Sequence, residues 1–232
     1  AAPVTVFVGE NGSGKSTLLE AMACALRLPA IGADDTAQDA TLASVRPLAD
    51  ALKLTFSRKA RHGFFLRAED FFGFTRRISQ MQRDLRAELA RVEEEYRDRS
   101  AFTKGQAKMA FASSLAELNA RYGVDPDARS HGESFLSLFA SRIQPGGLYL
   151  LDEPFGGVDP AARDYILETI LAGRAPGAAV LISTHMIAEL EPALDDAAFL
   201  GGGRLVMAGP AEQLRRERGM SLDALFREVF RC

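Results

Sequence analysis

The chain has 232 residues, of which 47% are hydrophobic and 25% are charged, and its formal net charge is −3. This composition allows a full α/β core, as one unit or as a catalytic lobe with a smaller helical lobe. The sequence contains no run of about 18 apolar residues and no basic leader followed by an apolar stretch, so we expect neither a membrane span nor an export signal. The two cysteines lack metal-site spacing, which favours a reducing cytoplasm and argues against zinc.

The first predicted element is a buried strand at 4–8 that leads into a glycine-rich loop. Residues 9–17 match the pattern G-x-x-x-x-G-K-[ST] at every position, and a helix is predicted at 16–27. Glycines let the backbone curl around a triphosphate, the helix N-terminus adds partial positive charge, and Lys15 adds a full charge at the β- and γ-phosphates. We therefore predict an ATP site that is held by Gly9, Asn11, Gly12, Ser13, Gly14, Lys15, Ser16 and Thr17.

The middle of the chain is predicted to be mainly helical and is locally basic. After a loop at 28–39 we predict strands at 53–56 and 63–66, then helices at 70–99, 106–121 and 133–142. Residues 53–108 carry 14 Lys and Arg against 8 Asp and Glu, although the whole chain is acidic. This region is either a basic arm for nucleic acid or a partner helix, or a helical lobe packed on the core with solvated Arg–Glu pairs; we favour the second. Its apolar stripe comprises Ile78, Met81, Leu85, Leu89, Val92 and Tyr96.

A second polar segment follows the predicted strand at 148–151 and reads Asp152-Glu153-Pro154. Asp152 at the end of a strand is placed to hold Mg²⁺ opposite the Ser16 hydroxyl, usually through water. Glu153 is then available to act on the attacking water as the catalytic base. Taken alone, an acidic pair after a short strand is as often a helix cap, but its distance from the glycine loop favours the metal and catalytic roles.

The last third alternates helices and strands. We predict helices at 160–172, 186–191, 210–218 and 221–229, and strands at 178–183, 196–200 and 204–208. Gly201-Gly202-Gly203 is predicted to form a hairpin turn between the last two strands. This alternation is typical of a layered α/β fold.

Five motifs in order resemble those of the ATP-binding-cassette (ABC) ATPases. Besides the phosphate loop and Asp152-Glu153, the Ser130-His131-Gly132-Glu133 segment resembles the family signature. Gly157-Val158-Asp159 resembles the D-loop, and Ser183-Thr184-His185 resembles the switch histidine. The resemblance implies a P-loop NTPase fold of the ABC type, with a catalytic lobe at 1–69 and 143–232 and a helical signature subdomain at 70–142.

The family resemblance also implies how such a site works. Two domains would pair head to tail, as a homodimer or with another ABC ATPase, and hydrolyse ATP at composite sites. Ser130, Gly132 and Glu133 would then reach the partner's nucleotide, Asp159 would line the interface, and His185 would sense the γ-phosphate as a catalytic residue. Binding of Mg·ATP and hydrolysis to ADP and phosphate are thus expected, in a cytoplasmic protein that can lie on the inner face of the membrane.

The resemblance divides into two parts, which leaves the partner open. Residues 1–153 resemble soluble stand-alone bacterial ATPases, whereas residues 155–232 resemble the ATP-binding subunits of ABC transporters, so the chain is either a mosaic or a natural lineage with both features. A membrane permease is the favoured partner. The alternatives are a soluble ATPase that acts without one, with nucleic acid as a candidate target, and a nucleotide-gated dimerisation module with little turnover. Glu69 stands nearest the family's coupling glutamine, although a solvated or capping role is favoured, and the start lacks the adenine-stacking aromatic.

Overall fold

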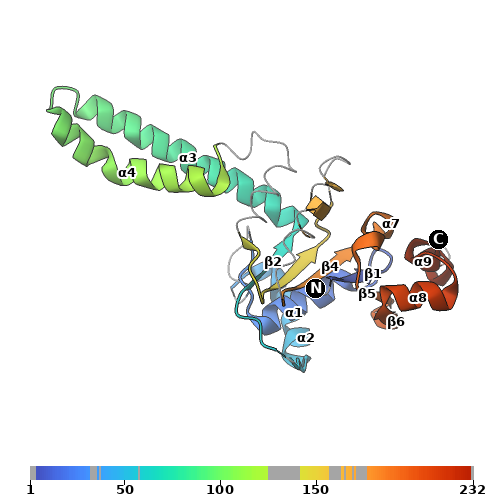
Figure 1. The fold of residues 1–232 in the computed structure, drawn as a ribbon. Coiled ribbons are helices and arrows are strands. Elements are labelled where there is room, and N and C mark those ends of the chain that lie inside the picture. The colour runs from blue at the N-terminus through green and yellow to red at the C-terminus, as the bar shows by residue number, and fades with distance from the viewer. Residues whose placement is uncertain are drawn as a thin grey trace.

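The structure is a computed structural model that describes residues 4–31, 36, 38–56, 58–124, 142–156, 163–164, 166–168, 170 and 177–230. It has the α/β fold expected of a P-loop NTPase, with helices packed against a mixed sheet (Figure 1). The six strands of this sheet are ordered β2-β3-β4-β1-β5-β6. They are β1 (Val4–Val8), β2 (Gly63–Arg67), β3 (Leu148–Asp152), β4 (Ala179–Thr184), β5 (Asp196–Gly201) and β6 (Arg204–Pro210).

The first five strands are parallel and largely buried, and β6 runs antiparallel to β5 at one edge. Parallel strands that are covered on both faces are apolar along their whole length, as the sequence patterns indicated. Six of the seven predicted strands are confirmed. The strand predicted at 53–56 is wrong: this segment pairs with no strand, because the outer edge of β2 is already bonded at Phe65 to Pro29 and Ile31.

The strand register brings the polar motifs to one edge of the sheet. Arg67 at the end of β2 lies opposite Asp152 at the end of β3, and Asp152 lies opposite Ser183 in β4. Val8, the last residue of β1, lies opposite Thr184. The carboxyl ends of four parallel strands therefore meet at one level, which is where α/β sheets of this kind bind ligands.

Shorter helices surround the sheet. Helix α1 (Lys15–Leu26) follows the glycine loop as predicted, and it packs on α2 (Arg46–Ala51) and the 3-10 helix η1 (Ala40–Val45). The last two were not predicted; the Asp39 carboxylate caps η1 by accepting from the Thr41 amide. The C-terminal part contains α7 (Ile187–Leu190), the 3-10 helix η2 (Glu191–Ala193), α8 (Ala211–Arg218) and α9 (Leu222–Phe230). The described residues between 163 and 170 are helical, as expected.

A long helical hairpin projects from the sheet. It consists of α3 (Ala68–Glu95) and α4 (Ala101–Tyr122), which pack against each other and extend away from the rest of the molecule (Figure 1). The predicted helix at 70–99 ends earlier, and the one predicted at 106–121 begins earlier because Ser100 caps it by accepting from the Thr103 amide. The end of the predicted subdomain, including the helix at 133–142, lies almost wholly outside the described residues, so its boundary stays a prediction.

Candidate active site

The glycine loop connects β1 to α1 with a backbone that glycine makes possible. Gly12 and Gly14 have positive φ angles of 79° and 99°, and Gly14 precedes the first turn of α1 without a side-chain cap. A side-chain carbon at Gly9 would lie only 2.2 Å from the Leu200 carbonyl oxygen, so no larger residue fits there. The uncapped N-terminus of α1 therefore offers backbone N–H groups to an anion at the end of a curled loop.

Lys15 is buried inside this loop. Its Nζ donates to the carbonyl oxygens of Gly9 at 2.8 Å and Glu10 at 3.1 Å. A lysine ammonium has three N–H donors, so one remains for a phosphate oxygen after these two bonds. The loop thus holds a positive charge in place beside the N-terminus of α1, and its contact with a triphosphate stays a prediction.

Ser13 supplies a second feature that fits an anionic ligand. Its carbonyl accepts a 3.0 Å bond from the amide of Gly203, in the turn between β5 and β6, which fixes the loop from the other side. Its Oγ is buried and has no hydrogen-bond partner among the described residues. Such an atom is costly to leave unsatisfied, and a phosphate oxygen would satisfy it. The neighbouring Asn11 and Thr17 are exposed.

The buried Asp152 and Ser183 form a polar group with the half-buried Ser16 at the ends of β3, β4 and the loop. The Ser183 hydroxyl donates to Asp152 Oδ1 in a short hydrogen bond, and the Ser16 hydroxyl also bonds this carboxylate. Burial raises the pKa of Asp152 above its usual value, although both hydroxyls and the nearby charges of Lys15 and Arg67 oppose the rise. The carboxylate and the Ser16 hydroxyl together are oxygen donors of the kind that Mg²⁺ prefers.

Glu153 occupies an unusual backbone conformation beside this group. Its φ angle is 47°, a left-handed value that is uncommon outside glycine, and its amide donates to both the Ser183 carbonyl and hydroxyl oxygens at 3.1 Å. The carboxylate lies 3.0 Å from His185 Nδ1. The turn after β3 therefore directs Glu153 toward the residue that follows β4, and it brings together the two residues predicted to be catalytic.

Arg67 adds a buried cation that the sequence motifs did not reveal. Its guanidinium binds Asp70 at 2.6 Å, Asp39 at 3.1 Å and Glu20 at 3.4 Å. Burial alone would lower the pKa of Arg67, but hydrogen bonding and charge from Asp70, with Asp39 and Glu20, raise it above its ordinary value. Burial alone would likewise raise the pKa of Asp39, but hydrogen bonds from Thr41 and the charge of Arg67 lower it.

Several predicted residues lie outside the part of the chain that the structure describes. They are Ser130, His131, Gly132 and Glu133 of the signature and Asp159 of the D-loop, so these roles stay predictions. The side chain of Glu69 is likewise not described. Within the described ranges, no three His, Cys, Asp or Glu side chains gather as a metal site. A divalent ion at Ser16 and Asp152 would therefore need ligands from water and phosphate, which is how Mg²⁺ commonly binds with nucleotides.

Comparison with known proteins agrees with this geometry. A family profile described as an AAA domain matches residues 1–106. The ABC-type transporter ATP-binding protein EcsA of Bacillus subtilis is 39% identical over 85 residues, 35% of this chain and 34% of EcsA. The nickel import ATP-binding protein NikO of Rhodobacter capsulatus is 29% identical over 214 residues, 90% of this chain and 79% of NikO. The sequence is therefore similar to those of ABC-type P-loop ATPases.

The match to EcsA covers only about a third of that relative's length, whereas the match to NikO crosses Asp152 and the residues that follow it. At 29% identity NikO does not distinguish a mosaic ABC chain from a natural lineage, so the mosaic origin stays a prediction. A solved ATP-binding subunit of an ABC transporter aligns with 98% of this chain and 88% of its own, at 23% identity and a TM-score of 0.47. Among the described residues, no helix has the length and apolar character needed to cross a membrane.

Proposed function

We propose that this ABC-type protein binds Mg·ATP and hydrolyses it to ADP and phosphate. The observation that carries the proposal is the meeting of Lys15, Ser16, Asp152, Glu153 and His185 at one edge of the sheet, within and beside a phosphate loop. Phosphoryl transfer depends mainly on positioning and on groups that stabilise the developing negative charge. The same edge supplies both, with a fixed cation in the loop and a carboxylate beside it.

Each residue then has a distinct task. Lys15 and the backbone N–H groups of the loop bind and orient the phosphates. Ser16 and Asp152 would hold Mg²⁺, which when bound neutralises charge on the β- and γ-phosphates. Glu153 would orient the attacking water and take its proton, and His185, 3.0 Å away, holds the Glu153 carboxylate in position and would sense the γ-phosphate.

We also propose that each active site is composite, with residues from two protomers. By the family resemblance, the signature residues Ser130, Gly132 and Glu133 of one protomer would complete the phosphate loop of another, with Asp159 at the interface. His185 is 58% exposed on its side chain, which suits a residue that acts at an interface with nucleotide and partner. Hydrolysis would then need two chains, as a homodimer or with another ABC ATPase.

The favoured physiological role is that of the ATP-binding subunit of a transporter, in the cytoplasm and peripheral to the inner face of the membrane. Relatives described as transporter ATP-binding proteins support this role, and a membrane permease would be the partner. A soluble ATPase without a permease is the second candidate. The projecting α3–α4 hairpin favours it, because much of its surface lies away from the sheet and is open to a macromolecular partner such as nucleic acid (Figure 1).

The test is steady-state phosphate release with Mg·ATP over a range of protein concentrations. We expect the rate per protomer to rise with concentration, because a composite site needs two chains. Glu153→Gln should lower turnover by about 10²- to 10⁴-fold, since a positioned general base contributes that much, while ATP binding persists. Glu189→Gln is the matched control, because it makes the same change at an exposed position on α7.

Three outcomes would contradict the proposal. Wild-type turnover in Glu153→Gln would show that Glu153 is not the base. A rate per protomer that does not depend on protein concentration would show that the site is not shared between two chains. Stabilisation of the fold by ATP with phosphate release at background would instead identify a nucleotide-gated module with little turnover. Co-purification with a membrane protein, against ATPase stimulation by DNA or RNA that falls steeply with salt, separates the two physiological roles.

A further inference from the structure

A large cavity lies at the edge of the sheet opposite the phosphate loop. Its volume is about 950 Å³, and its walls come from the end of α1, from α2, from the segment before β2 and from the starts of β2 and β3. Gly63 and Leu148 pair at the amino ends of these two strands, whereas Arg67 and Asp152 pair at the carboxyl ends. The cavity is therefore separated from the nucleotide edge by the length of a strand, about 15 Å.

The cavity carries a marked excess of positive charge. Five cations line it, and Asp50 is the one carboxylate among the described lining residues. None of the five forms an ion pair with a described carboxylate; Arg142 instead donates to the Tyr122 hydroxyl at 3.0 Å, and the guanidinium of Arg121 lies 5.8 Å from the same ring. The cations are Arg27, Lys59, Arg61, Arg121 and Arg142. Cations that no carboxylate of the described ranges neutralises, gathered around a concave surface, favour an anionic ligand.

A buried donor on Arg142 supports the same conclusion independently. Its Nε is buried and has no hydrogen-bond partner among the described residues. A guanidinium remains charged at any ordinary pH, so this N–H is a permanent donor without an acceptor. Since an unsatisfied buried donor is costly, an oxyanion that reached this N–H would relieve the cost, and the charge of Arg142 adds to the attraction for an anion elsewhere in the cavity.

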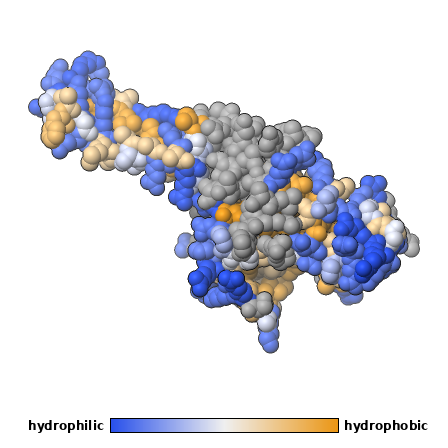
Figure 2. Space-filling model, in the orientation of Figure 1, coloured by the Kyte–Doolittle hydropathy of each residue, from blue (hydrophilic) through white to orange (hydrophobic). Residues whose placement is uncertain are grey.

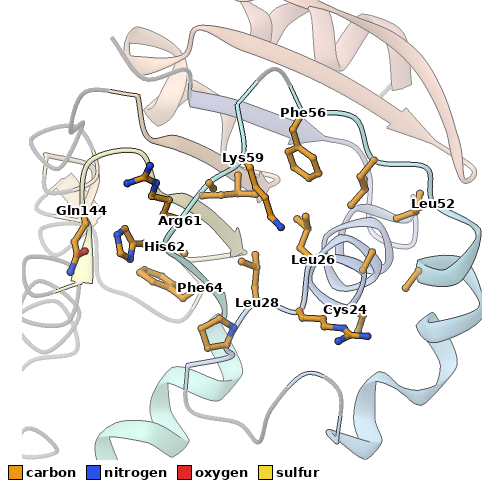
Figure 3. Close-up of a pocket in the computed structure, with 18 of the residues that line it drawn as sticks. Cys24, Leu26, Leu28, Leu52, Phe56, Lys59, Arg61, His62, Phe64 and Gln144 are labelled. Carbon is orange, nitrogen blue, oxygen red and sulfur yellow. The ribbon is translucent and has the colours of Figure 1, made fainter.

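Apolar side chains form one wall of the cavity, which constrains the rest of the ligand. Figure 3 shows Lys59 extending toward Leu26 and Leu28, with Phe56 above them. A smaller cavity of about 250 Å³ shares this wall and is lined mainly by apolar side chains, including Met22, Leu26 and Leu181. Phe56, which borders both cavities, is 45% exposed despite its aromatic ring. An apolar group beside the cations would cover it.

We propose that this cavity binds a free organic phosphate with an apolar body, its phosphate at Lys59 and Arg61 and its chain or ring against Leu26, Leu54 and Phe56. The cavity falls within the usual size range for small-molecule sites. Its walls from α1, α2 and β2 leave room for a phosphate group and an apolar group together. The site is distinct from the phosphate loop and does not depend on ATP hydrolysis.

Calorimetry with octyl phosphate, below its micelle concentration, tests the proposal directly. Inorganic phosphate has only the anionic part and octanol only the apolar part, so we expect each to bind at least tenfold more weakly than octyl phosphate. Equal affinity for inorganic phosphate or for octanol would overturn the proposal, because only one of the two surfaces would then be in use. Absence of octyl phosphate binding would overturn it as well.

Variants locate the binding. The double variant Lys59→Gln, Arg61→Gln should weaken octyl phosphate at least tenfold, and Phe56→Ser should weaken octyl phosphate but not inorganic phosphate. The matched control is Arg83→Gln with Arg86→Gln on α3, which removes the same charge outside the cavity and should leave the affinity unchanged. Equal loss in this control would show general charge attraction and overturn the site.

Two further arms exclude other sources of a signal. Lys15→Ala should bind octyl phosphate as the wild type does; loss of binding there would place the phosphate in the nucleotide loop and overturn the proposal. Vesicles of phosphatidylcholine with phosphatidic acid should not retain the protein. Retention that Lys59→Gln, Arg61→Gln abolishes would make the ligand a bilayer lipid and overturn the assignment to a free molecule. Circular dichroism confirms that each variant is folded.

Discussion

The nucleotide edge of the sheet and the α3–α4 hairpin use charge in opposite ways. At the nucleotide edge, Lys15, Arg67 and Asp152 are almost fully buried, and each is held by several hydrogen bonds. On the hairpin, Arg97 and Glu94 lie mostly in solvent, and the exposed Arg91 pairs with the half-buried Glu88. Figure 2 shows this surface as mainly hydrophilic, with hydrophobic residues between the charged ones. Charged side chains are thus part of the core at the nucleotide edge, whereas on the hairpin they are mainly solvated by water.

This difference predicts which charge substitutions change the stability of the fold most. A buried charge that loses its partner retains its desolvation cost, whereas an exposed charge that loses its partner is solvated by water. The buried groups also bridge distant segments, since Arg67 joins α1, α3 and the segment before η1. The hairpin pairs join residues one helical turn apart or across two neighbouring helices.

The largest effect should come from Arg67→Met. This change removes the cation but leaves Glu20, Asp39 and Asp70 together in a buried site, so we expect the free energy of unfolding to fall by about 3–5 kcal/mol. Urea denaturation measures it. Arg91→Met makes the same change on the hairpin and should cost less than about 1 kcal/mol.

Similar losses for Arg67→Met and Arg91→Met would contradict the comparison. Acid provides a second check. Despite burial, hydrogen bonds from Thr41 and the charge of Arg67 hold the pKa of Asp39 below its usual value, so this stabilisation is lost in acid and the penalty of Arg67→Met should shrink as the pH falls through that pKa. A penalty that is unchanged in acid would indicate lost packing rather than uncompensated charge.

An intermediate effect of opposite sign is expected for Asp152→Asn. Burial raises the pKa of Asp152, so the fold disfavours the charged carboxylate, and its removal should stabilise the nucleotide-free protein by about 1 kcal/mol, or 2–4 °C in Tm. Because the pKa of Asp152 is higher in the folded protein than the 3.8 of the unfolded chain, the wild type loses stability as the pH rises from 3.8 to the folded pKa. The variant lacks this carboxyl group, so its advantage in stability should vanish in acid. Thermal unfolding across pH measures this difference.

The same variant should lose the stabilisation that the wild type gains from Mg·ATP, because it lacks the predicted metal ligand. Ser113→Ala on α4 is a neutral control at an exposed position. If Asp152→Asn were more stable and still gained the full stabilisation from Mg·ATP, Asp152 would not be a ligand of the metal. Lower stability at neutral pH would contradict the cost assigned to its buried charge.

The smallest effect should come from Glu93→Gln. Glu93 on α3 pairs with Lys104 and Lys108 on α4 and is the best connected carboxylate of the hairpin's ion pairs within the described ranges. Because it is half exposed, we expect a loss below about 1 kcal/mol that disappears in about 1 M salt. Urea denaturation at low and high salt measures this loss. A larger loss of unfolding free energy that persists in high salt would show that Glu93 contributes like the buried charges of the core and would contradict the comparison.

The sequence predicted the elements whose signal is local. The buried strands, the glycine loop and the ends of β3 and β4 follow from apolar runs and from motifs, and the parallel sheet then brings Asp152 and Ser183 together. The short helices η1 and α2 were missed because they have few residues and little periodicity. The segment 53–56 has strand-like residues but no free edge at Phe65 with which to pair.

The candidate sites show the same division. Lys15 and Glu153 belong to motifs with fixed spacing, so their places in the loop and directly after β3 could be predicted. Arg67 depends on Asp39, 28 residues earlier, and on Glu20, 47 residues earlier, so no local pattern could reveal the network. The basic cavity combines residues from α1 to β3, and only the fold gathers them.

The junction of β2 with α3 gives the hairpin a mechanical property. Strand β2 ends at Arg67 and α3 begins at Ala68, with no loop between them, so the helix is an extension of the central sheet. A helix of 28 residues is about 42 Å long. A tilt of about 5° at its root would therefore move the tip by roughly 4 Å. Any rearrangement around Arg67 is thus amplified along the hairpin into a displacement large enough for a partner at its tip to detect.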